Sequence, residues 1–421
     1  MKNTKNLPDF TPSAAMSALV NEELRQDSFY HPNLAGITRG GMANHYPMTI
    51  MAMQGLGAND LDIISFRDSW PRHRAAIAED LGLKDVNEVT TQNWRQYLGQ
   101  SGKLREFRRV FLQLLGQGEI AEVVTQLLDA MKPGLPMGLF HPLIRLSFAT
   151  GHGDSGLIAD ALAYMAIRYQ DLYLEEPVIN PEPLEQLEVE ASLSTASPQV
   201  GQSWLSIRQW LEKGHLPGRL SRKIYGGSIS ICEQLCREQV IHQLALGTGF
   251  TLDEDELTPA IASICQAAAR LYLFEPALTT LHGVTSCQAL AELTLRYINH
   301  ENQAVYARLW RYFWLWLTAL YIEKGCPWLS GLFPDPALEQ LPETDPSNSE
   351  NTETKVVHSP YLNSNKEQQL ELVNWSSLKR LALRSQEVHV MKMIYSCDWL
   401  YRHIGQESAV QLAAIKALPQ G

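Results

Sequence analysis

The sequence predicts an all-α protein that forms one large multi-helix domain over residues 1–421. Apolar residues recur at three- and four-residue spacing in segment after segment, which is typical of amphipathic helices. Alternating strand patterns are scarce, and no internal repeat divides the chain. The 421 residues are 45% hydrophobic and include 10 Trp, which is enough to bury a large core and a ligand site within it.

The helical pattern extends from end to end. A first helix is expected within residues 9–27, and after a glycine-rich loop a second, nearly all-apolar helix begins at Asn44-His45. Further helices are expected at 59–75, around Trp94, and at 104–115, 120–131, 143–148, 157–173, 204–210, 231–246, 277–290, 306–322, 367–384, 388–403 and 408–418. Residues 341–365 are rich in Pro, Ser, Asn, Thr and Glu, which predicts a flexible loop.

Composition excludes several function classes. The formal net charge of -11 argues against a nucleic-acid surface, because phosphate binding needs a basic face. The polar N-terminus lacks the apolar core of a signal peptide, and the most apolar run, residues 312–322, is too short to span a bilayer. The 6 Cys are widely spread without zinc-site spacing, so reduced, buried thiols are expected. The sequence thus predicts a cytoplasmic protein that binds neither nucleic acid nor membrane.

Two histidines lie at the start of predicted apolar helices, in similar sequence contexts. Asn44-His45-Tyr46-Pro47 and His141-Pro142-Leu143 each place a proline in the first turn, where its missing N–H and fixed φ are tolerated. Either histidine could face the interior from this position. A purely structural role, in which His45 caps or packs beside the natural capping residue Asn44, is the competing interpretation.

A third histidine, His282, lies within Leu281-His282-Gly283-Val284-Thr285, in a predicted helix crowded with small and β-branched residues. Such a helix has poor intrinsic propensity, so we expect tertiary contacts to hold it. Taken alone, His282 could be a buried histidine whose ring is satisfied by a neighbouring carbonyl.

The fourth histidine is paired with a lysine. If residues 388–403 are helical, His389 and Lys392 lie on one face, next to an apolar stripe of Val388, Met391 and Tyr395. An inward lysine is costly as an ammonium and must find a partner, lose its proton or be modified. Carboxylation by carbon dioxide would convert it into an anionic oxygen ligand for a metal. The alternative is a lysine that extends to water and a histidine that fills space.

The chain therefore contains, in order, Asn44-His45-Tyr46-Pro47, His141-Pro142-Leu143-Ile144-Arg145-Leu146, Leu281-His282-Gly283-Val284-Thr285 and His389-Val390-Met391-Lys392. In this combination they resemble the questin oxidase-like family, and the resemblance covers most of the chain. It implies a non-haem iron oxygenase that oxidises aromatic polyketides of secondary metabolism, including C–C bond cleavage in anthraquinone-type substrates. It also implies an iron(II) ion held by His45, His141, His282 and His389, with carboxylated Lys392 as a fifth ligand.

The implied ligand set is chemically coherent. Imidazole suits iron, and one anionic carbamate partly offsets the charge that four neutral imidazoles leave uncompensated. Dioxygen must find an exchangeable position, for which Lys392 is the candidate ligand to move, giving it a catalytic role. NADPH or another external reductant is a candidate electron donor.

Three tryptophans, Trp310, Trp314 and Trp399, are candidates for the wall of an aromatic substrate pocket, with core packing as the alternative role for each. Two other functions stay open from the residues alone. A metal-dependent hydrolase could use a carboxylated lysine with zinc or nickel, and a non-catalytic helical protein could hold a hydrophobic aromatic ligand.

Overall fold

Helices account for the regular structure of the chain, as the sequence predicts. The computed structural model describes residues 17–34, 42–70, 88–172, 204, 207–208, 229–232, 254–329, 374–405 and 408–419. Within these ranges there is no β-strand, only an isolated antiparallel bridge between Asn33 and Ala43. The all-α prediction is confirmed for the described residues. The predicted loop at 341–365 and most of 204–210 and 231–246 lie outside them.

The α-helices are α1 (Ala18–Asp27), α2 (Tyr46–Gly55), α3 (Asp60–Ser69), α4 (Leu104–Leu115), α5 (Ile120–Met131), α6 (His141–His152), α7 (Ser155–Arg168), α11 (Glu254–Phe274), α12 (Leu278–Tyr297), α13 (Gln303–Glu323), α15 (Trp375–Ser385), α16 (Val388–His403) and α17 (Ser408–Ala417). Short 3-10 helices are η1 (Trp94–Tyr97), η2 (Ser101–Lys103) and η3 (Lys132–Gly134). The helix expected around Trp94 is therefore a single 3-10 turn, and α11 was not predicted.

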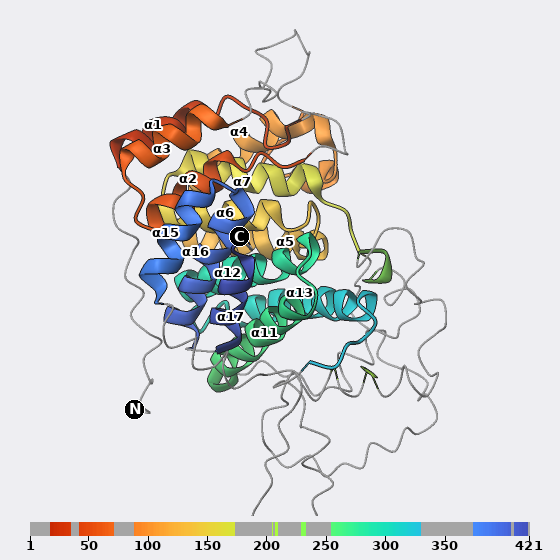
Figure 1. Ribbon diagram of the computed structural model, residues 1–421. Coiled ribbons are helices and arrows are strands. Elements are labelled where there is room, and N and C mark those ends of the chain that lie inside the picture. Colours follow the sequence, from red (N-terminus) through yellow and green to blue (C-terminus); the bar gives the residue numbers. More distant parts are fainter. Residues whose placement is uncertain are drawn as a thin grey trace, which may run out of the picture.

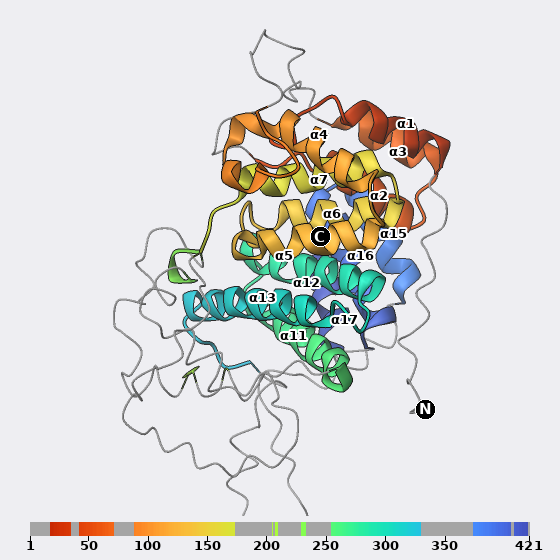
Figure 2. The same cartoon turned by 180° about the vertical axis from the view of Figure 1, so that it is seen from behind.

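The helices stack in layers. In both views α1, α3 and α4 lie at the top, α7 and α6 follow, and α12, α13 and α11 form the lower part (Figures 1 and 2). The C-terminal helices α15, α16 and α17, drawn in blue, lie along one side. Helix α12 is central, because it packs against α6, α11, α13 and α16, and α16 in turn packs against α2.

A buried polar cluster joins three of these helices, and we call it the Glu292 cluster. Ser147 of α6 and Gln288 of α12 donate to one oxygen of the Glu292 carboxylate at 3.0 and 2.7 Å. Arg296 donates to the other oxygen at 2.9 Å, and Ser396 of α16 donates to the Gln288 carbonyl at 3.1 Å. The cluster therefore fixes the register of α6 and α16 against α12.

None of the described helices is both long and apolar enough to cross a membrane.

Candidate metal centre

The four motif histidines and Lys392 come together at the ends of four helices. His45 is the N-cap of α2 and His141 is the first residue of α6, each followed by a proline in the first turn, as predicted. His282 lies in the first turns of α12, and His389 and Lys392 lie in the first turns of α16. The packing of α12 against α6 and α16, and of α16 against α2, places these helix starts side by side.

The imidazoles form a closed ring, which we call the histidine ring. Ring centroids lie 4.7 Å apart for His45 and His141 and 4.5 Å apart for His141 and His282. The remaining separations are 5.7 Å for His282 and His389 and 4.8 Å for His389 and His45. Each imidazole therefore neighbours two others, although the motifs lie far apart in the sequence.

Burial keeps three imidazoles of this ring neutral. His45, His141 and His282 are at most 8% exposed. Loss of water around the rings lowers the pKa of all three, that of His141 to about 3, and the Lys392 charge and neighbouring imidazoles act in the same direction. At neutral pH these side chains are uncharged imidazoles, which is the form that binds a metal ion.

Three of the four rings are held in one tautomer. The Nδ1 atoms of His141 and His282 lie 2.6 and 2.7 Å from the carbonyl oxygens of Gly138 and Leu278. Because a carbonyl oxygen can only accept, both Nδ1 atoms must carry the proton. His389 Nδ1 donates to the Glu387 carboxylate at 3.0 Å in the same manner. In the neutral form of each of these rings the Nε2 atom therefore carries the lone pair.

Two of these lone pairs face each other. The Nε2 atoms of His141 and His282 are 3.0 Å apart, and neither ring has a second proton to place between them at neutral pH. Such a contact is repulsive unless an electron-pair acceptor, a proton or a metal ion, is shared by both nitrogens. This pair of donors fits a metal ion better than it fits the metal-free protein.

Lys392 completes the group. Its side chain is 2% exposed, and its Nζ atom lies 2.6 Å from His45 Nδ1, between residues 347 positions apart in the sequence. Burial lowers the pKa of Lys392 to about 7, with the Glu387 carboxylate acting in the opposite direction. At neutral pH about half of the Lys392 side chains are therefore in the neutral, nucleophilic amine form.

The donor atoms form pairs rather than one shell. Within the described ranges no three His, Cys, Asp or Glu side chains make up a group arranged to hold a metal ion. His141 faces His282, and His45 faces Lys392, so the rings adjoin without their nitrogens meeting at one point. The types of donor fit a metal such as iron, and the metal site itself stays a prediction.

Sequence reasoning missed Glu387 as a functional residue. It is the N-cap of α16: one oxygen accepts from the Val390 backbone N–H at 2.7 Å while the other holds His389. Burial raises the pKa of Glu387, but these hydrogen bonds outweigh it and the pKa lies below its usual value. A carboxylate that holds the far nitrogen of a histidine is the usual outer partner of a metal ligand. An acidic residue directly before the His389 helix was the available signal.

The turn before α6 is strained. Gly138, Leu139 and Phe140 all have positive φ, at 65°, 54° and 60°, a conformation that costs about 1 kcal/mol or more for each non-glycine residue. This turn directs the Gly138 carbonyl at His141 Nδ1. Strain of this kind persists where the surrounding structure fixes it, and it is concentrated at functional sites.

The three predicted pocket tryptophans are buried, each with a partner elsewhere. Trp310 donates to Thr294 at 3.0 Å, and Trp314 stacks on Trp204 with ring centroids 5.1 Å apart. The Trp399 ring lies 4.7 Å from that of His403. Their role in substrate binding stays a prediction.

Two other aromatic residues belong to, or pack against, segments that carry ring histidines. Phe140 directly precedes His141, and its ring meets that of Trp316 at 4.6 Å in an edge-to-face arrangement. A methyl group on Gly283, the neighbour of His282, would lie 3.9 Å from the Trp316 ring. Phe140 and Trp316 are therefore further candidates, beside the predicted tryptophans, for the wall of an aromatic pocket.

Comparisons with known proteins identify the family of the chain. No curated protein matches the sequence. A scan against protein families matches residues 42–397, which include all four histidines and Lys392, to the family described as questin oxidase-like. This match covers most of the chain, and the family description indicates an oxidoreductase that acts on a small molecule. The chain therefore belongs to the questin oxidase-like family.

Proposed function

We propose that this protein is a non-haem iron-dependent oxygenase that oxidises an aromatic polyketide-type substrate with dioxygen. The observation that carries the proposal is the histidine ring, with the facing Nε2 atoms of His141 and His282 at 3.0 Å. Membership of the questin oxidase-like family supports the substrate class and the redox chemistry. C–C bond cleavage in the substrate is part of the proposal.

The ligands would be His45, His141, His282, His389 and carboxylated Lys392. The neutral Lys392 amine would attack carbon dioxide, forming an N–C bond and releasing one proton, so that the side chain becomes an anionic carbamate. The product would supply the negative charge that four imidazoles lack. Bound iron(II) would supply the electron transfer that activates dioxygen.

The protein's own groups would prepare the site. Gly138, Leu278 and Glu387 hold three imidazoles with Nε2 free for the metal. Locked tautomers lower the reorganisation that accompanies ligand binding. Phe140 and Trp316 would exclude water and provide an apolar surface for a planar substrate.

The site would be reached from the His389 side. The His389 side chain is 25% exposed, whereas the other four members of the group are at most 8% exposed. A substrate approaching there would meet His389 before the buried rings of the other three histidines.

The direct test combines metal content with oxygen uptake. Anaerobically purified protein should contain about one iron per chain, and it should consume dioxygen when anthraquinone-type compounds are added. Assays with and without NADPH test the need for an external reductant. His282→Ala should lose both iron and oxygen uptake. His300→Ala, at a histidine whose side chain is 84% exposed, is the matched control and should keep both.

Other results would reject the proposal. Stoichiometric zinc or nickel with hydrolytic turnover would favour the hydrolase. A metal-free protein that binds aromatic ligands and cannot be loaded with iron would favour the binding protein.

A further inference from the structure

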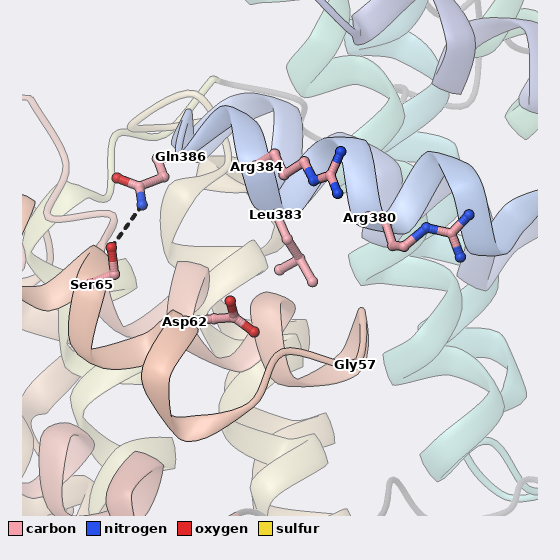
Figure 3. A pocket seen from close by; sticks show the side chains of 7 residues that line it. All are labelled: Gly57, Asp62, Ser65, Arg380, Leu383, Arg384 and Gln386. Carbon is pink, nitrogen blue, oxygen red and sulfur yellow. Dashed lines mark hydrogen bonds between the residues drawn. The ribbon is translucent and has the colours of Figure 1, made fainter.

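A groove opens between α3 and α15, and none of the histidine-ring residues lines it. It has a volume of about 460 Å³ and is lined by Gly57, Asp62, Ser65, Arg380, Leu383, Arg384 and Gln386 (Figure 3). We propose that this groove binds the phosphate group of a small phosphorylated polyol, such as a sugar phosphate or a nucleotide. The proposal goes beyond the proposed oxygenase function and does not depend on it.

Two arginines give the groove its positive charge. Arg380 and Arg384 lie one turn apart on α15, both are exposed, and their guanidinium groups extend to the same side of the helix (Figure 3). Like charges at this spacing repel each other and weaken a helix. Arg384 lies in the last turn, where the helix dipole favours a cation, but Arg380 lies a turn earlier. Helix stability therefore does not explain why two arginines occur at these positions.

No acidic residue neutralises these arginines in the part of the chain that the structure describes. Arg380 donates to the Ser377 hydroxyl at 3.0 Å, and neither arginine forms an ion pair there. Their neighbour on α15, Lys379, pairs with Asp398 at 2.9 Å. Because neither arginine has a carboxylate partner among the described residues, both guanidinium groups have donors to offer to an external anion.

The charge of two arginines favours phosphate over carboxylate. Each guanidinium presents a planar fork of donors that matches the oxygens of either anion, but two positive charges are better balanced by a phosphate than by a single carboxylate. A phosphate monoester has three terminal oxygens and a larger charge, so it can engage both arginines at once.

The opposite wall of the groove accepts hydrogen bonds. Asp62 of α3 faces Leu383 across the groove, and one of its carboxylate oxygens accepts from the Asn59 backbone N–H at 2.9 Å (Figure 3). The Gln386 amide, at the C-terminal end of α15, donates to Ser65 of α3 at 3.0 Å and so joins the two walls at one end of the groove. A carboxylate repels a second anion but binds hydroxyl groups. A ligand with phosphate at one end and hydroxyls at the other matches both walls, and the groove volume suits a molecule of that size.

The test is calorimetric titration of the 421-residue chain with ribose 5-phosphate, inorganic phosphate and ribose at constant ionic strength. Ribose 5-phosphate should bind most tightly, phosphate more weakly and ribose not measurably. Arg380→Gln with Arg384→Gln should weaken binding of ribose 5-phosphate at least about tenfold, because two charge-assisted contacts are lost. Arg380→Lys with Arg384→Lys, which keeps the charge and removes the forks, should give an intermediate affinity.

Arg25→Gln with Arg311→Gln is the matched control, because it removes the same charge from residues that do not line the groove. This control should bind ribose 5-phosphate as the unaltered chain does. The proposal is overturned if no phosphate compound binds the unaltered chain, or if both glutamine double variants lose affinity equally. Equal binding of inorganic phosphate and ribose 5-phosphate would refute the polyol part. Thermal unfolding of each variant, and phosphorus NMR of the unaltered chain, keep the result independent of a folding defect.

Discussion

The Glu292 cluster and the histidine ring both contact α6, α12 and α16, yet they differ in how their polar atoms are satisfied. In the Glu292 cluster both carboxylate oxygens accept hydrogen bonds, and Arg296 compensates the charge. In the histidine ring two lone pairs face each other at 3.0 Å and a lysine amine is buried against an imidazole.

This difference distinguishes buried polar groups that stabilise the fold from buried polar groups that bind a ligand. A buried polar group that stabilises a fold needs a partner within the protein, whereas an uncompensated set of donors has a use only when a ligand arrives. Burial alone would not distinguish the Glu292 cluster from the histidine ring, because the same helices enclose both. The two clusters are distinguished by whether each polar atom has a hydrogen-bond partner within the protein.

The largest expected effect concerns acid stability of the metal-free protein. His141 has a folded pKa of about 3 against 6.5 in the unfolded chain, and the pKa values of His45 and His282 are lowered in the same direction. The unfolded chain therefore binds more protons below pH 6.5. Stability should fall as pH falls through this window, by about 1.4 kcal/mol per pH unit for each histidine that stays neutral.

Urea unfolding between pH 7.5 and pH 4 measures this slope. Glu292 has the opposite effect on this slope. Burial raises its pKa above 4.5, so the folded state binds the Glu292 proton more readily than the unfolded chain does. His141→Gln should lower the slope by about one proton. An unchanged slope in that variant would show that His141 is protonated in the fold.

The second effect is specific to the Glu292 cluster. Glu292→Ala leaves Arg296 without its buried partner and removes an acceptor from Ser147 and Gln288, so the free energy of unfolding should drop by about 3 kcal/mol. Iron binding per folded chain should be retained. Loss of iron without loss of stability would reverse the assignment of the two clusters.

The third effect is specific to the histidine ring. Iron(II) at a hundred times its dissociation constant should stabilise the unaltered chain by about 2.7 kcal/mol, since only the folded state binds it. His282→Ala should abolish this gain, while Glu292→Ala keeps it. Thermal unfolding with and without anaerobic iron(II) measures both, and a gain that persists in His282→Ala would place the metal elsewhere.

The smallest effect concerns the residue that orients His389. Glu387→Gln should weaken iron binding by about 10- to 100-fold through loss of the charged outer partner. The helix cap is partly kept, so the cost in stability should be about 1 kcal/mol or less. Competition with a chelator measures the affinity. Unaltered iron affinity in this variant would show that Glu387 serves only as a helix cap.

The sequence predicted the helices well where periodicity and punctuation agreed. The helices at 104–115, 120–131 and 388–403 agree with α4, α5 and α16 at both ends. The prolines after His45 and His141 correctly placed both at helix starts. Helix α11 was missed because Pro259 lies inside it, although Ile261, Ile264 and Leu271 carry a helical period.

The site was less accessible to sequence reasoning. The family motifs named residues that lie side by side in the fold, but the contact between Lys392 and His45 joins residues 347 positions apart, which no local pattern encodes. Carbonyl partners such as that of Gly138 depend on a left-handed turn that residue types do not specify. The contact between Phe140 and Trp316 likewise joins two segments, the start of α6 and the helix α13, that lie far apart in the sequence.

The central claim is that the histidine ring binds iron. X-ray absorption at the iron edge of the anaerobically loaded chain tests it most directly, because imidazole ligands give characteristic outer-shell scattering. We expect a nitrogen and oxygen shell with scattering from several imidazoles, which decreases in His282→Ala. A shell containing sulfur, or one without imidazole scattering, would contradict it.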